Sequence, residues 1–564
     1  MIVYDYEVFK YDWLVVFLDI MKREFKVIVN NPEELKKFHE KNKKQIFIGF
    51  NNISYDQYIH KGIMLGMNPH TISDFIINKK KQGWEYSRLF NDIPMVNYDV
   101  YNKRHGRLKA IEGHMGVSIV ESEVDFNIDR PLTKKEIEST IKYCKADVEQ
   151  TLRIFALKKN DFQSTLDVIN HFNLPLKYIG KSDAQLAGIV LQGVKQPRRD
   201  GYDLELPDVI EIEKYKEVVE WYLNPLNHTP KSYTTVNVCG FEHKFAWGGL
   251  HSARKNYIAE GDFVLIDVNS YYPSMILAYN LLSRNAQRPE LYKDIYDMRF
   301  KLKAKGDPKQ EAFKLIMNIV YGASGDQYNV LYDPKMRNIV CVTGQLLLLD
   351  LLEKFEKYDI MVIQSNTDGI LVKYESKEEL KLITELAEEW SERTGMKFGY
   401  DYFYRIIQKD VNNYIALGKE GTKDVFNGAY VKLNSEMDND LPILTRSVRE
   451  YLINGIPPEE TINNETRLIE FQKICKVTKH YKYAKHNGVR LRETVLRVFA
   501  SRSKYDGAVY RYKEGAGYHK FANTSEKSFI DNGDVRNKVV PAKLDRQYYI
   551  DRAWKMINDY LKAD

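Results

Sequence analysis

Residues 263–274 read FVLIDVNSYYPS, an apolar run that predicts a β-strand ending at Asp267. Pro273 suits the first turn of a helix that follows this strand. Further along, MVIQSNTDGILV (361–372) predicts two strands joined by a tight turn that holds Asp368. An aspartate at a strand end and one at a hairpin tip can meet on a sheet surface, and carboxylate oxygens suit Mg²⁺ or Mn²⁺. We therefore expect Asp267 and Asp368 to share a divalent-cation site.

Two helices are predicted between these aspartates, and both carry cations. Arg299 and Lys303 are four residues apart on the first helix, and Asp307 is expected as the N-cap of the second. The second helix has a polar stripe at i, i+4 and i+7, namely Lys314, Asn318 and Tyr321. A nucleoside triphosphate held by these cations would supply the metal-binding oxygens that two carboxylates lack. The alternative is a solvated polar face beside a core stripe.

The first 156 residues alternate short β-branched runs with helical stretches, which is typical of an α/β domain. Asp5 and Glu7 share one strand face, Asp56 follows another apolar run, and Tyr143 and Asp147 share a helix face. Four converging carboxylates would repel one another unless divalent cations neutralised them. Two cations about 4 Å apart can activate a water for phosphodiester cleavage, and Tyr143 could hold that water. The alternative is that each acid is an ordinary surface charge.

The remaining segments are less regular. The polar stretch 170–176 is expected to be a linker, followed by a Gly/Ser-rich connection at 180–194. Between residues 473 and 504 ten lysines or arginines face the single acid Glu493, with tyrosines interleaved. Such a stretch suits a surface that tracks phosphates with steep salt dependence, and its candidate DNA contacts are Lys479, Lys482, Arg490 and Arg492. The alternative is a lysine-rich solvated helix.

Composition sets the limits of these interpretations. A chain of 564 residues is expected to form several domains, and its net charge of +6 is too small to indicate nucleic acid by itself. Four scattered cysteines predict neither a disulfide framework nor a zinc site. The first residues show no signal peptide, and no apolar run approaches the ~20 residues of a membrane span. We expect a multi-domain protein of a reducing compartment, without membrane association.

Six motifs, in order, resemble those of family B DNA polymerases. DVNSYYPS resembles motif A, KLIMNIVYG motif B and NTDG motif C, and WGGLHSA (247–253) resembles the YxGG element that links exonuclease and polymerase modules. The amino-terminal acids resemble the DEDDy 3′–5′ exonucleases. DVNSYYP and VDFNIDRPLT (124–133) are similar to bacteriophage enzymes, including protein-primed polymerases, although their insertions are missing here.

The resemblance implies an α/β and α+β multi-domain fold, with an RNase H-like exonuclease domain and a right-hand polymerase. The implied division is exonuclease 1–170, linker and first part of the palm 171–280, fingers 281–345, second part of the palm 346–432 and thumb 433–564. The implied activity is primer-dependent DNA synthesis with proofreading, with two Mg²⁺ (or Mn²⁺) per active site. The implied partners are primer–template DNA and dNTPs, with a phage helicase or single-strand-binding protein as candidate helpers of strand displacement. A monomer in the host bacterial cytoplasm is expected.

The resemblance also assigns roles residue by residue. The polymerase metals would be held by Asp267, the Val268 carbonyl and Asp368. The incoming nucleotide would contact Arg299, Lys303, Lys314, Asn318, Tyr321 and Tyr272, the last excluding a 2′-hydroxyl. The exonuclease metals would be held by Asp5, Glu7, Asp56 and Asp147. Tyr143 would orient water, and Asn52 and Tyr55 would hold the frayed primer end.

Four positions depart from the family pattern. Asn366 stands where motif C usually has an aspartate, and Ile319 replaces the usual serine of motif B. The Lys-x-Tyr primer element becomes Asn412-Asn413-Tyr414, so Lys409 is the expected source of the primer charge contact. Glu121 stands where a lysine often lies near the exonuclease metals. The alternatives are a nuclease whose second half only clamps DNA, a protein-primed initiator and a binding scaffold with decayed sites.

Overall fold

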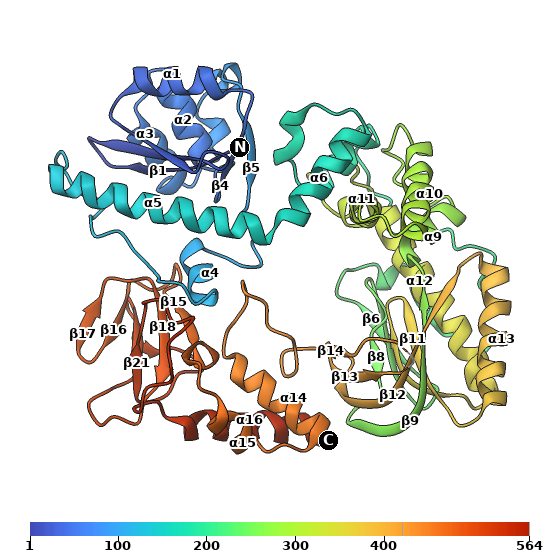
Figure 1. Cartoon of the computed structure of the whole chain (residues 1–564). Helices are drawn as coiled ribbons and strands as arrows, with labels where there is room; N and C mark the ends of the chain where they lie inside the picture. Colours follow the sequence, from blue (N-terminus) through green and yellow to red (C-terminus); the bar gives the residue numbers. More distant parts are fainter. Residues whose placement is uncertain (420, 563–564) are drawn as a thin grey trace. The chain divides into compact units, whose positions relative to one another are not determined.

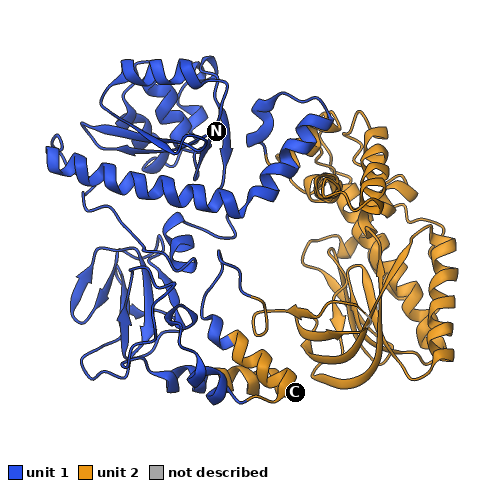
Figure 2. Ribbon diagram, in the orientation of Figure 1, with its two compact units in different colours: residues 1–181, 434–444, 457–552 blue, residues 182–433, 445–456, 553–564 orange. Residues whose placement is uncertain are grey.

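The computed structural model describes residues 1–419 and 421–562, which form two compact units (Figure 2). The first unit contains residues 1–181, 434–444 and 457–552. The second contains residues 182–433, 445–456 and the chain from 553 onward. The stretch expected as a thumb, 433–564, is therefore divided between the two units, and most of it belongs with the amino-terminal domain.

The first unit begins with a mixed five-stranded sheet in the order β3-β2-β1-β4-β5 (Figure 1). β1, β2 and β3 are antiparallel, whereas β4 and β5 run parallel to β1. Its strands are β1 (Ile2–Val8), β2 (Trp13–Asp19), β3 (Glu24–Val29), β4 (Ile46–Gly49) and β5 (Val96–Asp99). Its helices are α1 (Pro32–Asn42), α2 (Asp56–Met64), α3 (Pro69–Ile77), α4 (Leu108–His114), α5 (Lys134–Leu157) and α6 (Lys159–His171).

The alternation of side chains along β1 determines where its acids point. Val3 shares a core cluster with Cys144 and Val148 of α5, whereas Tyr4 and Tyr6 belong to the core on the opposite face. Since every second residue of a strand faces the same way, Asp5 and Glu7 lie on the α5 side with Val3. The capping box predicted at the start of α5 is present, because Thr133 and Glu136 bond reciprocally.

The rest of the first unit is a small β-rich domain. One sheet has the order β15-β18-β21 and the other β17-β16-β19-β20. The strands are β15 (Lys473–Lys476), β16 (Tyr483–His486), β17 (Val489–Leu491), β18 (Val495–Ala500), β19 (Val509–Lys513), β20 (Gly517–Lys520) and β21 (Ser528–Ile530). The basic stretch 473–504 is thus built of strands and turns, and the alternative of a solvated lysine-rich helix is wrong. Helix α15 (Pro458–Asn464) precedes this domain, and α16 (Arg546–Leu561) follows it.

The second unit is organised around a seven-stranded sheet in the order β14-β13-β12-β9-β11-β10-β8. The central strand β9 pairs antiparallel with β11 on one side and β12 on the other. The sheet consists of β8 (Ser252–Ala253), β9 (Tyr257–Val268), β10 (Met361–Asn366), β11 (Gly369–Tyr374), β12 (Phe398–Asp410), β13 (Asn413–Gly418) and β14 (Val425–Asn427). A separate hairpin joins β6 (Tyr233–Val238) to β7 (Phe241–Ala246). The predicted strand before Asp267 and the predicted hairpin around Asp368 are both confirmed.

The helices of this unit include the pair that was expected to carry cations. They are α7 (Asp183–Val190), α8 (Lys216–Leu223), α9 (Tyr271–Ala278), α10 (Glu290–Ala304), α11 (Gln310–Ser324), α12 (Pro334–Lys357), α13 (Lys377–Thr394) and α14 (Pro442–Asn454). Two expectations were wrong. The connection at 180–194 contains α7, which Ser182 and Gln185 cap reciprocally. Helix α11 begins at Gln310 rather than after Asp307, whose carboxylate accepts the Lys309 N–H at 2.9 Å in the preceding turn.

The predicted linker at 170–176 is also shorter than expected, because α6 continues to His171 and a short 3-10 helix begins at Leu176. The predicted fold class, an α/β and α+β multi-domain protein, is confirmed by the mixed five-stranded sheet, the antiparallel seven-stranded sheet and their helices. Among the described residues, no helix combines the length and the apolar character that crossing a membrane requires.

Candidate active sites

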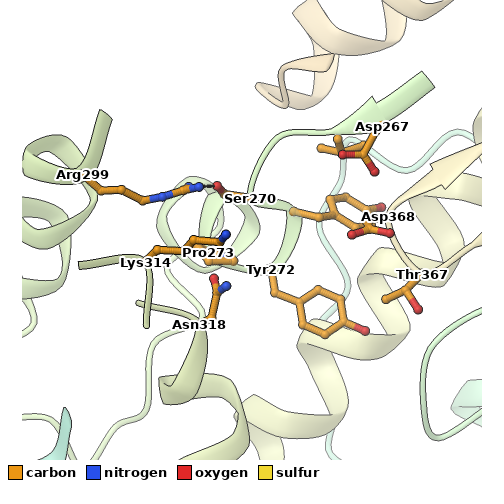
Figure 3. A pocket seen from close by; sticks show the side chains of 11 residues that line it. Asp267, Ser270, Tyr272, Pro273, Arg299, Lys314, Asn318, Thr367 and Asp368 are labelled. Atoms are coloured by element: carbon orange, nitrogen blue, oxygen red, sulfur yellow. Dashed lines mark hydrogen bonds between the residues drawn. The ribbon is translucent and has the colours of Figure 1, made fainter. Parts of the chain in front are cut away.

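The aspartate pair, Asp267 and Asp368, lies where β9 ends and the β10–β11 hairpin turns. Gly369, directly after Asp368, is the cross-strand partner of Asp267. The backbone N–H of Val268 donates to the carbonyl of Asp368 at 2.7 Å. A Cβ atom at position 369 would lie 3.2 Å from Asp267 Oδ1, so glycine at this position permits the close approach. The two carboxylates line one cavity of about 290 Å³ (Figure 3).

Burial and mutual repulsion strain the ionised form of this pair. Burial, followed by the charges of Asp368 and Asp401, raises the pKa of Asp267 to about 7. Burial also raises the pKa of Asp368, and the nearby His251 offsets only part of this increase. Asp267 is half-buried and Asp368 is exposed at the cavity, and two neighbouring carboxylates that resist ionisation are an incomplete anionic site, which a cation would complete.

Cations face the aspartate pair from the two helices α10 and α11. Arg299 of α10 and Lys314 and Asn318 of α11 line the same cavity (Figure 3). Arg299 donates to the Ser270 hydroxyl, and its Nε is buried without a partner among the described residues. Ser270 is held at φ +51° at the start of α9, which aims its side chain at the arginine. Lys303 does not line the cavity, although its charge acts on Asp267.

Tyr272 and Tyr321 form an aromatic pair beside this cavity, with ring centroids 4.6 Å apart. Tyr272 and the buried Val268 line the cavity, whereas Tyr321 contacts it only through Tyr272. Burial, and then the side chain of Tyr321, raises the pKa of Tyr272 far above its ordinary value. Both tyrosine hydroxyls therefore stay protonated, and the two rings can contribute through their shape.

The two residues expected to contact a primer strand have different surroundings. Tyr414 is close enough for the charge of Asp368 to raise its pKa, although burial is the larger cause. Lys409 instead points at α16, where its Nζ contacts the Asp559 carboxylate at 2.9 Å and lies 5.2 Å from the Tyr430 ring centre. The structure therefore brings Tyr414, but not Lys409, towards the aspartate pair.

Asn366 takes part in a hydrogen-bond network next to the aspartate pair. Its Oδ1 accepts from the Thr367 N–H at 2.9 Å and lies 2.7 Å from His251 Nδ1. His251 Nε2 lies 3.3 Å from the Thr367 hydroxyl. The motif-C turn is thus tied to the WGGLHSA segment, a contact that could not be predicted from the sequence.

The carboxylate cluster, Asp5, Glu7, Asp56 and Asp147, lies in the first unit and lines a cavity of about 470 Å³. Asp5 and Glu7 come from β1, Asp56 from the first turn of α2, and Asp147 from α5. Asp56 is anchored by the Tyr6 N–H, which donates to its Oδ1 at 3.2 Å. One ligand atom each from Asp5, Glu7 and Cys144 lies within 4.8 Å of the others. The quartet predicted from the sequence is therefore brought together.

Burial and repulsion shift the pKa values of the cluster upward. Burial, then Asp56 and Asp147, raises the pKa of Asp5 well above its ordinary value. Burial, then Asp5 and Asp147, does the same for Glu7. Burial raises the pKa of Asp56 to about 7, even though backbone N–H groups favour its charged form.

Lys109 of α4 is a cluster residue that the sequence reasoning missed. Its ammonium group contacts the Asp147 carboxylate, lies 3.1 Å from Glu112 and sits 4.7 Å from the Tyr143 ring centre. Lys109 thus supplies the positive charge that was expected at position 121, where this chain has a glutamate. Glu121 instead accepts from the Thr494 N–H and hydroxyl and from the Val495 N–H, at 2.6, 2.9 and 3.0 Å. The i, i+3 spacing of Lys109 and Glu112 can be read from the sequence, but no sequence pattern connects this pair to Asp147.

Asn52, which was expected to hold a DNA end, does not reach the cluster cavity. It is fully buried, and its amide donates to Tyr4 and Asn97 at 3.4 and 3.2 Å. Its neighbour Asn51 lines the cavity instead, with φ +62°. Tyr55 and Tyr143 line the cavity as expected. Asn51 was not expected at this site, and its backbone N–H is held by the distant Asp99 carboxylate at 2.8 Å.

The donor chemistry of both sites fits a hard divalent cation. Each site offers carboxylate oxygens with raised pKa values, and in the cluster Lys109 pairs with Asp147 while Arg107 also lines the cavity. Oxygen ligands of this kind suit Mg²⁺ or Mn²⁺. The pair and the cluster are therefore candidate metal sites.

Comparisons with known proteins give limited similarity. No protein-family model matches the chain. It is 26% identical over 132 residues to the DNA polymerase alpha catalytic subunit of Mus musculus, which is 23% of this chain and 8% of that protein. It is 26% identical over 155 residues to the same subunit of Oryza sativa subsp. japonica, 22% of this chain and 10% of that protein. The structure of the family B DNA polymerase from Pyrobaculum calidifontis aligns with a TM-score of 0.45 and 13% identity, over 100% of this chain and 78% of that chain.

Proposed function

We propose that this chain is a DNA-directed DNA polymerase of family B type with a 3′–5′ proofreading exonuclease. The observation that carries the proposal is the shared cavity of Asp267 and Asp368, which Arg299 and Lys314 face from the helix pair. Acids on one side and cations on the other suit a metal-bound triphosphate. The motif resemblance and the local similarity to DNA polymerase alpha catalytic subunits support the same activity.

In synthesis, Arg299 and Lys314 would bind the phosphates of the incoming dNTP, and Tyr272 would pack beneath its sugar. Asp267 and Asp368, with the Val268 carbonyl, would hold the divalent cations, which supply activation of the primer hydroxyl and neutralisation of the leaving pyrophosphate. Asn318 and Tyr321 would border the nascent pair. Tyr414 would lie beside the primer strand.

In excision, the cluster would hold the same kind of cation, with Asp5, Glu7, Asp56 and Asp147 as ligands. Tyr143 stays protonated, because burial and the neighbouring carboxylates raise its pKa far above the working range. Its hydroxyl is hydrogen-bonded to Asp147 and would accept from, and so position, a water beside the scissile phosphate. Asn51 and Tyr55, which line the same cavity, would contact the terminal nucleotide.

The finer features of the proposal rest on the motif pattern. The short intervals between motifs A, B and C favour a primer-dependent enzyme over a protein-primed initiator. The phage-like segments favour replication of phage DNA in a bacterial host, with primer–template DNA and dNTPs as the ligands. A helicase or single-strand-binding protein would assist strand displacement, and the chain would act as a monomer.

The test is primer extension and excision by the wild-type chain beside Asp368→Ala and Asp5→Ala. With Mg²⁺ and dNTPs, Asp368→Ala should lose extension by at least ~10³-fold and keep excision, because only the pair is broken. Asp5→Ala should lose excision to a similar degree and keep extension. Extension products resolved on a gel, and terminal nucleotides released from single strands, measure the two activities.

Three outcomes would contradict the proposal or part of it. A wild-type chain that shortens primers and never lengthens them would favour a nuclease that only clamps DNA with its second unit. Loss of both activities in either variant would show that the two sites are not independent. Synthesis without a primer would favour the protein-primed alternative.

A further inference from the structure

The last turns of α16 pack against the hairpin formed by β12 and β13, and all three segments belong to the second unit (Figure 2). Ile557 and Tyr560 of the helix share an apolar cluster with Ile407 of β12 and Ile415 of β13. Ile407 and Ile415 are cross-strand partners, so the helix covers one face of the hairpin. We call this the back face.

The opposite, front face of the hairpin carries Tyr414, which the proposed function places beside the primer strand. Tyr414 is the cross-strand partner of Gln408, the residue after Ile407. Since successive strand residues point to opposite faces, Tyr414 lies on the side away from α16. There it shares an apolar cluster with Leu265, which lies two residues before Asp267 on the same face of β9. The front face thus continues to the aspartate pair.

The strand ladder is interrupted next to Tyr414. The register of β12 against β13 shifts between Gln408 and Asp410, so Lys409 is an extra residue on its strand. Such a bulge disrupts the ladder locally and bends the strand. Contacts outside the ladder must therefore fix the part of the hairpin that carries Tyr414.

Tyr560 spans this interruption with its hydroxyl group. The hydroxyl lies 2.9 Å from the carbonyl oxygen of Ile407 and 3.1 Å from that of Asn413, so one O–H is shared between the two strands. The Asn413 carbonyl belongs to the planar peptide unit that ends at the Tyr414 nitrogen. Holding this carbonyl therefore fixes the backbone from which the Tyr414 ring projects. Tyr560 is 1% exposed, so water has little access to this bond.

Asp559 holds the bulged residue from the same turn of α16. Its carboxylate accepts from the Lys409 ammonium at 2.9 Å and from the Tyr430 hydroxyl, and its backbone carbonyl accepts from the same ammonium at 2.6 Å. The Lys409 ammonium also lies 5.2 Å from the centre of the Tyr430 ring. An ion pair as exposed as this one adds little stability, so its main effect is to hold the bulge towards α16.

From these contacts we infer that Asp559 and Tyr560 are positioning residues for the primer end, because they hold the hairpin from behind and so set the place of Tyr414 relative to the aspartate pair. We call these two residues the α16 brace. The inference rests on the proposed polymerase function. Placement matters in such a reaction, since a shift of about 1 Å can cost about a hundredfold in rate. Lys409 then connects the hairpin to α16 and does not bind a primer phosphate.

The targets of the brace distinguish it from ordinary helix packing. Packing alone would need only the apolar cluster, whereas Asp559 and Tyr560 bond to the residues that flank Tyr414 and its cross-strand partner. The competing interpretation is that Asp559 masks a primer-binding Lys409 until DNA arrives. The two interpretations predict opposite effects of removing the Asp559 charge.

The test is a double-mutant cycle between the brace and Tyr414, in primer extension by the full chain with Mg²⁺ and saturating dNTPs. Tyr560→Phe removes only the hydroxyl, and Asp559→Asn removes the charge at nearly constant shape. Each should raise the primer–template KM about fivefold, within the roughly two- to tenfold that one hydrogen bond is worth, and change the dNTP KM less than twofold. In a Tyr414→Ala background the same substitutions should change the primer–template KM less than twofold, because effects that act through one residue are not additive.

A matched control removes a buried tyrosine hydroxyl of the same unit that bonds to a carbonyl away from the hairpin. Tyr222→Phe loses the bond to the Ala246 carbonyl at 3.0 Å and should leave both KM values unchanged. Equal effects of Tyr222→Phe and Tyr560→Phe would overturn the inference, because lost stability would then explain both. Brace effects that add fully to that of Tyr414→Ala would overturn it as well. So would a lower primer–template KM in Asp559→Asn, which would show that the freed lysine binds DNA.

Failure of the inference can be told apart from failure of the proposed polymerase. Fluorescence anisotropy of a labelled primer–template, measured with Ca²⁺ and without dNTPs, reports binding without synthesis. If the chain does not extend primers, yet Tyr560→Phe weakens this binding and Tyr414→Ala removes the difference, the brace stands and the polymerase does not. If extension is normal and Tyr560→Phe behaves like Tyr222→Phe in both assays, the brace is wrong.

Discussion

The carboxylate cluster of the first unit and the aspartate pair of the second differ in how many negative charges they gather and in what neutralises them. The cluster places four acids around one cavity and has a lysine of its own, Lys109, in contact with them. The pair has two acids, and its cations, Arg299 and Lys314, stand across the cavity on separate helices. In the proposed function this difference reflects the number of phosphates that each substrate brings to its site. A strand being cut brings one phosphate to the cations, whereas a dNTP brings three.

The difference also appears in how deeply the acids are buried. Asp56 and Glu7 are 4% and 7% exposed, and burial is the largest cause of their raised pKa values. Such a site is costly to keep ionised without a cation. The comparison therefore predicts that the cluster, more than the pair, limits the stability of its unit when metal is removed.

The largest expected effect comes from removing the lysine of the cluster. Lys109→Met would leave Asp147 and Glu112 buried without their partner, and breaking a buried ion pair costs about 3–5 kcal/mol. Both side chains are nearly inaccessible, with exposures of 7% and 1%. We expect the first unit to unfold at lower urea in EDTA, monitored by pulse proteolysis, and millimolar Mg²⁺ to recover part of the loss.

The control for this prediction is Lys26→Met, which removes a lysine from a surface ion pair with Glu34 of the same domain. It should change the free energy of unfolding by less than about 1 kcal/mol, as exposed pairs do. A Lys109→Met chain as stable as this control in EDTA would show that the cluster acids are not charged in the metal-free protein.

The pH dependence of the metal-free first unit is the next largest effect. The pKa of Asp56 is about 7 in the folded chain against an ordinary 3.8, so the folded state keeps a proton that the unfolded state releases between these values. This contribution is fully present below about pH 4 and is lost as the pH rises through 7. A shift of three pKa units corresponds to about 4 kcal/mol.

Buried His60 acts in the opposite direction at lower pH. Burial and the neighbouring His39 and Lys61 lower its pKa well below 6.5, so stability is lost as the pH falls below 6.5, where the unfolded chain binds a proton. The fall caused by Asp56 therefore spans about pH 4 to 7, and thermal unfolding in EDTA should show it most clearly between about pH 6.5 and 7.5, where His60 no longer opposes it. Asp56→Asn should flatten this fall, and an unchanged slope in that variant would mean that Asp56 is already ionised.

A smaller effect is expected on the nucleotide side of the aspartate pair. Lys314 lines the pair cavity and Lys303 does not, although the sequence predicted both as triphosphate contacts. A hydrogen bond to a charged group contributes about 1.5–3 kcal/mol, so Lys314→Ala should raise the dNTP KM at least tenfold. Lys303→Ala is the matched comparison and should raise it less than threefold. Single-nucleotide incorporation kinetics measure both, and equal effects would mean that the helix pair closes further on the nucleotide than this structure shows.

Much of both sites could be predicted from the sequence, because their acids lie on regular elements. Two-residue alternation fixes Asp5 and Glu7 on one face of β1, and the tight turn before Gly369 fixes Asp368. Lys109, Asn51 and His251 could not be predicted in the same way. Each reaches its site through a tertiary contact across many residues, and no local period encodes such a contact. The same reason explains why Lys409 was expected at the primer and instead pairs with Asp559.

The smallest expected effect concerns Asn366, the neutral residue of motif C. Its Oδ1 accepts from Thr367 N–H and lies 2.7 Å from His251 Nδ1, so an aspartate could accept the same bonds. Asn366→Asp would add a negative charge that can accept from His251 and that repels Asp368. The two effects oppose each other, and in an exposed region an ion pair contributes only about 0.2–1 kcal/mol. We expect extension rates and the half-saturating Mn²⁺ concentration to change less than fivefold.

His251→Ala in both backgrounds gives the comparison that decides between two interpretations of Asn366. If Asn366 and His251 work as a matched pair, removing His251 should cost the Asn366→Asp chain more than the wild type, since a carboxylate then stays unpaired next to Asp368. A gain of a hundredfold or more from Asn366→Asp alone would instead mean that the asparagine impairs the pair. The second unit would then be closer to a DNA clamp than to a polymerase, and the cluster would be the chain's main catalytic site.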